Sequence, residues 1–438
     1  MGNIVAIVGR PNVGKSTLFN RLIGERKAII DDISGVTRDR IYGFSHWNGK
    51  NFSVVDTGGL VRGSDDVFEA AIASQVQIAI DEADVIIFLN DVVTGITDLD
   101  DKVADMLRRT KKNVICVVNK VDNPERNLQA NEFWALGFEN TVFLSAITGS
   151  GTGELLDMIV DLLPYAKDDN LASESKIPRI AILGQPNVGK SSLTNALLGE
   201  ERNIVTDIPG TTRDAIYTHY NKFGHNFYLI DTAGIRKKAK VSEDLEFYSV
   251  IRAIKAMDEA DVCILMIDAQ TGVEAQDMTI FSLIQKKRKG MVIAVNKWDL
   301  MEKETNTARD YEEQIKLKIS PFTDIPIVFI SVLEKQRILK VIEYAMEVYH
   351  NKTRRIKTSE LNEWLQVVTE RIPPPTHRGK NISIKYVTQL PTRYPAFAFF
   401  CNHPKHVKDS YKNYLENQLR RSFNFSGVPI SLVFKDKS

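Results

Sequence analysis

Two eight-residue stretches, GRPNVGKS at residues 9–16 and GQPNVGKS at residues 184–191, have the composition of a phosphate-binding loop. In the pattern G-x-x-x-x-G-K-[ST], backbone N–H groups of a glycine-rich turn surround phosphates at the start of a helix. Ordinary residue frequencies give one chance match in a chain of this length with a probability of about 1–2%. Two matches that share PNVGKS therefore predict two phosphate sites.

The rest of the chain repeats at nearly the same offset, which predicts a duplicated domain. Three further motifs recur 175 or 177 residues later: VTRD at 36–39 as TTRD at 211–214, DTGG at 56–59 as DTAG at 231–234, and VVNKVD at 117–122 as AVNKWD at 294–299. The change of two residues in the offset is typical of insertions in surface loops.

The order of the motifs assigns a role to each shared position of the repeat. We expect the loop lysine to reach the β- and γ-phosphates and the loop serine to hold Mg²⁺ with the aspartate of DTxG. The threonine of [VT]TRD would close over Mg²⁺ and the γ-phosphate, and the last glycine of DTxG would bring its N–H to that phosphate. The predicted catalytic residues are Lys15, Thr37, Gly59, Lys190, Thr212 and Gly234, and the predicted Mg²⁺ ligands are Ser16, Thr37, Asp56, Ser191, Thr212 and Asp231.

The N-K-x-D motif predicts guanine as the base. Its aspartate can accept two hydrogen bonds from the guanine ring, a pair that adenine does not offer, so the wrong base leaves buried groups unpaired. The asparagine would brace the loop, the lysine stem would cover the ring, and the small-residue loops SAIT (145–148) and SVLE (331–334) would lie near the base. Val332 is bulkier than Ala146 but offers the same backbone N–H.

The complete set of residues predicted to contact GTP or GDP comes from these four motifs. In the first copy it is Gly9, Arg10, Pro11, Asn12, Val13, Gly14, Lys15, Ser16, Thr17, Asp56, Thr57, Gly58, Gly59, Leu60, Asn119, Lys120, Asp122, Ser145 and Ala146. In the second copy it is Gly184, Gln185, Pro186, Asn187, Val188, Gly189, Lys190, Ser191, Ser192, Asp231, Thr232, Ala233, Gly234, Ile235, Asn296, Lys297, Asp299, Ser331 and Val332. The roles of Arg38 and Arg213 stay open between a γ-phosphate contact and a surface ion pair.

The expected fold is α/β, with two tandem P-loop domains and a small α+β domain. Continuous apolar runs such as VIIFLND (85–91) and VCILMID (262–268) predict strands buried on both faces of a mostly parallel sheet with helices on both faces. After residue 350 the pattern reads helix, strand, strand, helix, strand. We predict a first domain at 1–165, a linker at 166–177, a second domain at 178–350 and a third at 351–438.

The distribution of charge and the positions of the cysteines limit the classes of protein to which this chain can belong. Residues 351–438 contain 16 Lys and Arg against 6 Asp and Glu, whereas the remaining residues carry 41 against 50, so the last domain is a basic module on acidic ones. Cys116 and Cys263 lie in apolar runs, which predicts buried free thiols. With no long apolar run and no leader pattern, we expect a cytoplasmic protein without a membrane partner.

The ordered motifs, duplicated, resemble the EngA (Der) family of bacterial double GTPases, whose members join two G domains to a C-terminal KH-like domain. The resemblance covers the whole chain and implies a ribosomal partner, the large subunit and its rRNA, in a GTPase that assists ribosome biogenesis. We expect a monomer and no DNA partner. The basic domain suits RNA, but it lacks the GXXG loop with which KH modules clamp nucleotides, so docking on the acidic domains stays an alternative.

One departure concerns the hydrolytic water. Ras-type GTPases place a glutamine directly after DxxG to orient that water, but this chain has Leu60 and Ile235 there. Related families are similar in this respect and often use K⁺ held partly by a loop asparagine, a position matched by Asn12 and Asn187. Loop bracing is the alternative role for these two asparagines.

Two other function classes stay open from the residues alone. One is an RNA-modifying enzyme, which would need a catalytic centre that the sequence does not display. The other is a nucleotide-state sensor in which one site binds GTP without turning it over.

Overall fold

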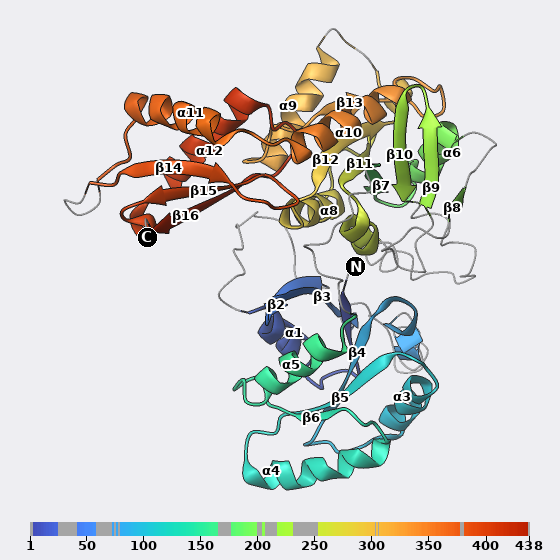
Figure 1. Cartoon of the computed structure of the whole chain (residues 1–438). Coiled ribbons are helices and arrows are strands. Elements are labelled where there is room, and N and C mark those ends of the chain that lie inside the picture. The colour runs from blue at the N-terminus through green and yellow to red at the C-terminus, as the bar shows by residue number, and fades with distance from the viewer. Residues whose placement is uncertain are drawn as a thin grey trace. The chain divides into compact units, whose positions relative to one another are not determined.

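The structure of the chain is a computed structural model. It divides into two compact units, Met1–Ala172 and Ser173–Ser438 (Figure 1). The residues that the structure describes are 3–24, 42–57, 72–73, 76–77, 79–164, 177–198, 204–205, 217–230, 253–302, 304, 306–376 and 381–436.

The first unit is built on a six-stranded sheet in the order β2-β3-β1-β4-β5-β6. Its strands are β1 (Ile4–Val8), β2 (Tyr42–Trp47), β3 (Lys50–Asp56), β4 (Val85–Asp91), β5 (Asn113–Asn119) and β6 (Thr141–Phe143). All neighbours are parallel except β2 and β3. The strands β1 and β4 are buried along their whole length, as continuous apolar runs predict.

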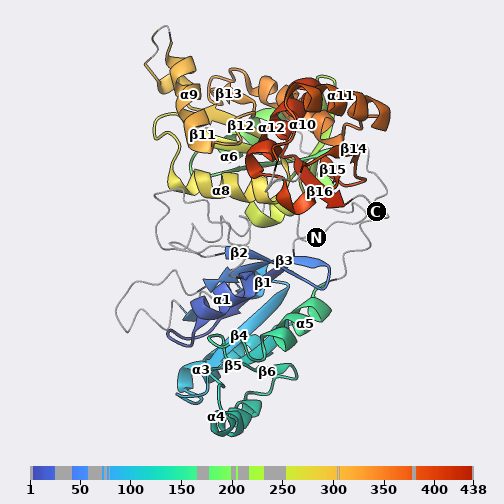
Figure 2. The same cartoon turned by 90° about the vertical axis from the view of Figure 1, so that its left-hand side faces the viewer.

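Helices cover both faces of this sheet (Figure 2). They are α1 (Lys15–Ile23), α3 (Asp98–Arg108), α4 (Pro124–Gln129), the 3₁₀ helix η2 (Ala130–Leu136) and α5 (Thr152–Leu162). Leu18 and Phe19 of α1 and Leu155 and Ile159 of α5 share one apolar core with the strands. This packing fixes the start of α1 directly beyond the carboxyl end of β1.

The second unit repeats the design on a seven-stranded sheet, in the order β13-β12-β11-β7-β10-β9-β8. Its strands are β7 (Arg179–Gly184), β8 (Ile204–Val205), β9 (Tyr217–Lys222), β10 (His225–Ile230), β11 (Val262–Asp268), β12 (Gly290–Asn296) and β13 (Ile327–Phe329). Its helices are α6 (Lys190–Leu198), α8 (Ala275–Lys286), η4 (Trp298–Leu300), α9 (Thr307–Ile319) and α10 (Ile338–Thr353). The pair β9 and β10 is antiparallel, as are β2 and β3 of the first unit.

The C-terminal part of the second unit has the predicted order of elements. They are α11 (Thr358–Arg371), β14 (Ile384–Gln389), β15 (Ala396–Cys401), η5 (Pro404–His406), α12 (Asp409–Phe423) and β16 (Ser431–Asp436). Strands β14 and β15 are antiparallel and β15 and β16 parallel. Helices α11 and α12 lie together over one face of this sheet (Figure 1), and their leucines share its core. The predicted fold class, α/β with a small α+β domain, is confirmed.

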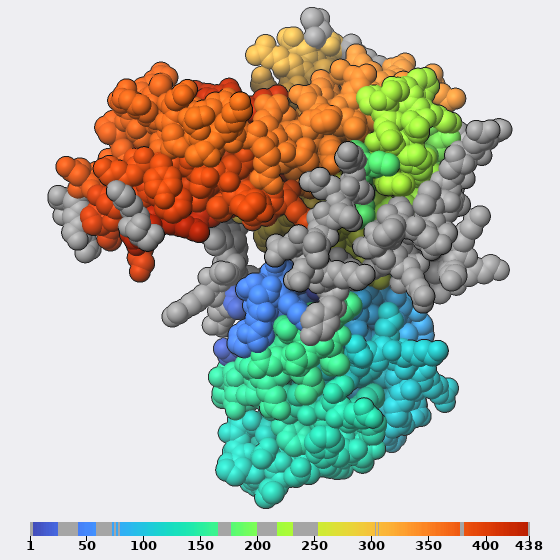
Figure 3. Space-filling view, viewed as in Figure 1, coloured from blue at the N-terminus to red at the C-terminus, as the bar shows by residue number. Residues whose placement is uncertain are grey.

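A backbone junction joins this small domain to the seven-stranded sheet, and no gap separates the two in the space-filling view (Figure 3). The N–H of Met291, at the start of β12, donates to the carbonyl of Gly427 across 2.8 Å, and the N–H of Gly427 donates to Asp324 across 2.7 Å. Gly427 has a φ of 73°, and a Cβ there would lie 2.4 Å from Val348 Cγ2 of α10. Only glycine fits this position without a clash.

The cysteine prediction is confirmed. Cys116 and Cys263 are free and buried within their strands, and Cys401 is free and buried as well. Burial raises the pKa of the Cys116 and Cys263 thiols to about 12. Among the described residues, no helix has both the length and the apolar character that crossing a bilayer requires.

Candidate functional site

The first phosphate-binding loop lies between the end of β1 and the start of α1. Gly14 forms the N-cap of α1 in the left-handed region, and a Cβ there would lie 2.4 Å from the Nδ2 atom of Asn119. No side chain caps this helix, and its first turn contains no acidic residue. The free N–H groups and the positive end of the helix dipole therefore face the loop, which favours an anion.

The loop lysines fold back onto their own loops. Lys15, 8% exposed, donates from Nζ to the carbonyls of Gly9 and Arg10, each across 2.7 Å. Lys190 makes the same contacts to Gly184, at 2.8 Å, and Gln185. Burial lowers the pKa of Lys15 to about 8, although the nearby Asp56 carboxylate opposes the shift.

Two side chains predicted to hold Mg²⁺ meet beside the first loop. Ser16 Oγ donates to Asp56 Oδ2 across 2.9 Å, and Asp56 is a 2% exposed residue at the end of β3. A hydroxyl and a carboxylate are the hard oxygen donors that Mg²⁺ prefers. In the second copy Ser191 lies in α6, the helix that follows the loop.

Several predicted site residues lie outside the described residues. They are Thr37, Arg38, Gly58, Gly59, Leu60, Thr212, Arg213, Asp231, Thr232, Ala233, Gly234 and Ile235.

The asparagine of N-K-x-D joins its own loop, called the base loop here after its predicted role, to the phosphate loop. Asn119 Nδ2 donates to the carbonyl of Val13 across 2.8 Å, and its Oδ1 accepts the N–H of Ala146 at 2.9 Å. We call this pair of hydrogen bonds the asparagine strap. The second copy repeats it, since Asn296 Nδ2 lies 2.8 Å from the carbonyl of Val188 and Oδ1 lies 3.1 Å from the N–H of Val332.

The lysine of N-K-x-D has a partner that sequence reasoning missed. Lys120 takes a left-handed conformation, φ 67°, and its Nζ lies 2.5 Å from Asp91 Oδ2 at the end of β4. Lys297, φ 62°, pairs in the same way with Asp268 at the end of β11. The sequence does contain a signal for this contact: the two aspartates end matching buried strands and lie 177 residues apart, which is the offset of the repeat.

The carboxylate predicted to select guanine is accessible in the first copy. Asp122 is 40% exposed and accepts a hydrogen bond from Arg126 Nη1 at 2.7 Å. In the second copy Asp299 is half-buried in η4. Ser145 and Ser331, the first residues of the small-residue loops, are both buried.

The second residue of each phosphate loop is held by a buried carboxylate that the sequence analysis did not single out. Arg10 Nε lies 3.1 Å from Asp100 Oδ2, and Gln185 Nε2 lies 2.9 Å from Asp277 Oδ2. Each aspartate stands at the third position of its helix, α3 or α8, where it also completes a capping box. The first loop is thus anchored by an ion pair and the second by a neutral side chain.

The loop asparagines stand in nearly identical conformations. Asn12 has a φ of 65° and Asn187 a φ of 64°, and both residues are exposed at the loop surface. Asparagine tolerates this left-handed region better than most residues, which accounts for its presence in the turn.

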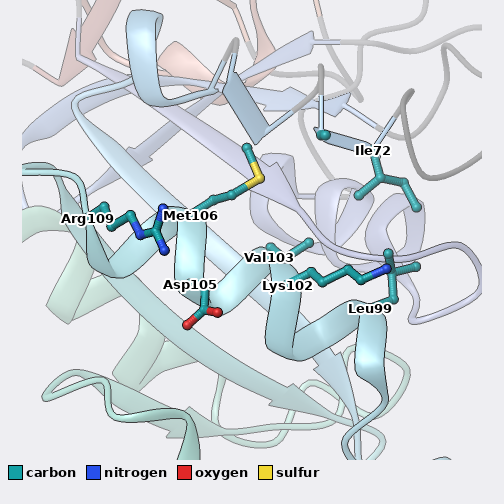
Figure 4. Close-up of a pocket in the computed structure, with 8 residues that line it drawn as sticks. Ile72, Leu99, Lys102, Val103, Asp105, Met106 and Arg109 are labelled. Atoms are coloured by element: carbon teal, nitrogen blue, oxygen red, sulfur yellow. The ribbon is translucent and has the colours of Figure 1, made fainter.

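A pocket of about 310 Å³ lies in the first unit (Figure 4). Its lining comes from α3 and from the short described stretch before β4, and comprises Ile72, Ala73, Leu99, Lys102, Val103, Asp105, Met106 and Arg109. None of these residues belongs to the predicted nucleotide set.

Taken together, a phosphate loop beyond the first strand of a mostly parallel sheet and a strapped N-K-x-D loop, both present twice, define a tandem P-loop GTPase. The family described as "50S ribosome-binding GTPase" matches residues 4–120 and 179–297, and the family described as the C-terminal KH-domain-like part of EngA bacterial GTPase enzymes matches residues 355–435. The chain belongs to the family of GTPase Der proteins.

Full-length relatives named GTPase Der support this assignment. The protein of Christiangramia forsetii is 57% identical over 437 residues, covering 100% of both chains, and that of Flavobacterium johnsoniae is 58% identical over 435 residues, covering 99% of both. Among solved structures, Aquifex aeolicus Era bound to GDP and AlF₄⁻ is 20% identical, with a TM-score of 0.31, covering 60% of this chain and 93% of Era. The full-length GTPase Der relatives and the matching family models confirm the predicted family, and membership in it supports GTP hydrolysis by this chain.

Proposed function

We propose that both G domains bind GTP with Mg²⁺ and hydrolyse it, and that hydrolysis changes the arrangement of the domains during assembly of the large ribosomal subunit. The asparagine strap carries the nucleotide part of the proposal. It places the base loop and the phosphate loop at a fixed separation in both copies, as a nucleotide that spans the two loops requires.

The residues of the first site divide the work between phosphate and metal. Lys15 would exchange its two carbonyl partners for phosphate oxygens, which favour its charged form. Ser16 and Asp56 would hold Mg²⁺, which neutralises charge that develops on the phosphates. Thr37 and Gly59 would close over the γ-phosphate, as would Thr212 and Gly234 in the second site, so that loss of this phosphate releases the switch segments.

The absence of a glutamine after DxxG requires another source of transition-state stabilisation. We assign it to K⁺ beside the β- and γ-phosphates, with Asn12 and Asn187 as ligands. Both asparagines are exposed at the loop surface, where an amide oxygen can reach a cation, and a cation there would act as an arginine finger does.

The ribosomal partner rests on two supports. The family that matches both G domains is described as ribosome-binding, and residues 351–438 carry a balance of +10, which suits an RNA partner. We expect the protein to act in the cytoplasm as a monomer, with domains whose arrangement follows the nucleotide state.

The test combines turnover with co-sedimentation. GTP hydrolysis is measured in KCl and NaCl buffers of equal ionic strength, and binding to purified large subunits is measured with GDP or a non-hydrolysable GTP analogue. Potassium-stimulated turnover and analogue-dependent sedimentation are the expected results. Equal turnover in the two salts would remove the potassium assignment, and no sedimentation in any state would remove the ribosomal role.

A nucleotide-state sensor is the second candidate, because the two sites differ in their anchors. The first loop is held by the Arg10–Asp100 ion pair and the second by the neutral Gln185. Separate Lys15→Ala and Lys190→Ala variants distinguish the two functions. In a sensor, loss of binding at the passive site leaves turnover unchanged, whereas in a double enzyme each substitution lowers it.

A further inference from the structure

Among the described residues, helices cover only one face of the C-terminal sheet (Figure 1), and an aromatic pair stands on the other face. Tyr386 of β14 and Phe400 of β15 are register partners with ring centroids 4.3 Å apart and planes 12° from parallel. Tyr386 is 40% exposed. The core side chains Val387, Phe397 and Phe399 point to the opposite face, toward α11 and α12.

A shift in register exposes Tyr386, whereas Phe400 beside it is half-buried. The pairing of β14 with β15 skips a residue between Ile384 and Tyr386, so that Lys385 and Tyr386 are both exposed while Val387 is buried. Such a bulge is a common device for redirecting a side chain. It places a cation directly beside the exposed ring.

Charge is unevenly distributed over the small domain. Five of its six acidic residues lie on helices α11 and α12, and the sixth is Asp436. The row of Tyr386 and Phe400 continues across the sheet to Lys435, the register partner of Phe400. Asp436, one residue further, alternates to the other face of β16. The helix-free face therefore combines two stacked rings with lysines and has no acidic neighbour in that row.

We infer that this helix-free face binds single-stranded RNA by stacking unpaired bases on Tyr386 and Phe400, with Lys385 and Lys435 contacting phosphates. The inference rests on the proposed ribosomal function and names the surface that serves it. Base stacking on sheet aromatics does not need the GXXG loop that this domain lacks. The lysines complement any anionic surface, and the stacked rings select RNA among such surfaces, because unpaired bases can stack on the rings while phosphates contact the lysines.

The first test measures binding of a labelled twelve-nucleotide oligouridylate to the full chain. Tyr386→Leu/Phe400→Leu keeps an apolar cross-strand contact but removes both rings, and we expect binding at least tenfold weaker. Tyr386→Phe keeps the ring and should bind as the unaltered chain does. Equal binding by the double leucine variant would overturn the inference.

The second test separates the two faces by salt dependence. Removing two phosphate contacts should make the slope of log K against log salt shallower by about 1.4 for a single strand. Lys385→Ala/Lys435→Ala should show this change, whereas the control Arg371→Ala/Arg421→Ala removes two cations from α11 and α12 and should not. Equal slopes for the two variants would contradict the assignment.

Hydroxyl-radical footprinting of the full chain tests whether the helix-free face is accessible in the free protein and covered when RNA binds. Tyr386 should be oxidised in the free protein and protected by the oligonucleotide. Protection without RNA would mean that protein covers this face and would overturn the inference.

The experiments distinguish a failure of this RNA-binding inference from a failure of the proposed ribosomal function. If the double leucine variant keeps both oligonucleotide binding and subunit sedimentation, only the inference falls. If the oligonucleotide protects Tyr386 but the chain never sediments with large subunits, only the ribosomal function falls.

Discussion

Asn119 and Val13 are joined by a hydrogen bond of 2.8 Å that connects the base loop at the end of β5 with the phosphate loop before α1. The same bond joins Asn296 and Val188 in the second unit. The amide is buried in both copies and fills the space beside Gly14 or Gly189 that any Cβ would occupy. Each asparagine therefore stabilises the phosphate loop as well as the base loop.

Asn119→Ala should weaken binding at the first site even for a ligand without a base. The substitution leaves the buried carbonyl of Val13 unpaired, at a cost of about 1–3 kcal/mol, or about 5- to 150-fold in Kd. Binding of GTP and of inorganic triphosphate is compared in a Lys190→Ala background, which removes the second site. Asp122→Ala is the control, because it should lose guanine selectivity and keep triphosphate binding. A loss confined to GTP in the Asn119 variant would contradict the strap.

Nucleotide binding to the first site should take up protons near pH 8. Burial lowers the pKa of Lys15 to about 8 in the free protein, and phosphates raise it by favouring the ammonium. Affinity is therefore highest below pH 8 and falls as the pH rises through 8 toward the pKa of the bound state. Calorimetry of the Lys190→Ala variant at pH 8, in two buffers of different ionisation enthalpy, should give an uptake of roughly half a proton. Zero uptake would show that Lys15 keeps its proton in the free loop.

Gly427→Ala should loosen the small domain from the second G domain. The residue has a φ of 73°, and the added Cβ would lie 2.4 Å from Val348 Cγ2 and 2.7 Å from the Met291 carbonyl. Gly224→Ala is the matched control, because Gly224 has a φ of 77° and a Cβ added there would meet no atom within 4 Å. We expect the control to lose about 1 kcal/mol of unfolding free energy and the Gly427 variant at least about 2 kcal/mol, measured by urea titration. Equal losses would mean that the junction tolerates the extra methyl group.

The three cysteines should resist thiol reagents in the folded chain. The thiolate is the reactive form, and a pKa of about 12 leaves Cys116 and Cys263 with a thiolate fraction of roughly 10⁻⁴ at pH 8. Burial also raises the pKa of Cys401. A disulfide reagent at pH 8 should find three reactive thiols in denaturant and none on the same timescale without it. A fast-reacting thiol in the native protein would place one cysteine at the surface.

The parts of the fold that sequence predicts best are those where a single pattern decides the structure. Strands β1, β4, β11 and β12 are buried along their whole length, so their apolar runs are continuous. The first phosphate loop directly follows β1, and the second N-K-x-D motif begins at Asn296, the last residue of β12. The short order of elements after residue 350 is predictable for a similar reason, because proline and glycine separate its periodic stretches.

The contacts that sequence reasoning missed depend on backbone geometry. The sequence pattern shows only that Asp91 ends a strand. Its contact with Lys120 is not predictable from the pattern, because it requires Lys120 to adopt a left-handed backbone conformation. Tyr386 escapes notice in the sequence, because regular alternation does not anticipate the bulge that exposes it beside Lys385. Asp100 has the spacing of a helix cap, and its second partner, Arg10, lies 90 residues away in sequence.

The hydrogen bonds of Gly427 with Met291 and Asp324 also limit how this gene can recombine with its relatives. A chimera joined near residue 172 inherits both sides of the junction from one parent. A crossover near residue 350 would instead seat a foreign loop against β12 and α10, where a displaced backbone meets Val348 at once. The second G domain and the basic domain are therefore expected to be inherited as one block, with the first G domain as the exchangeable part.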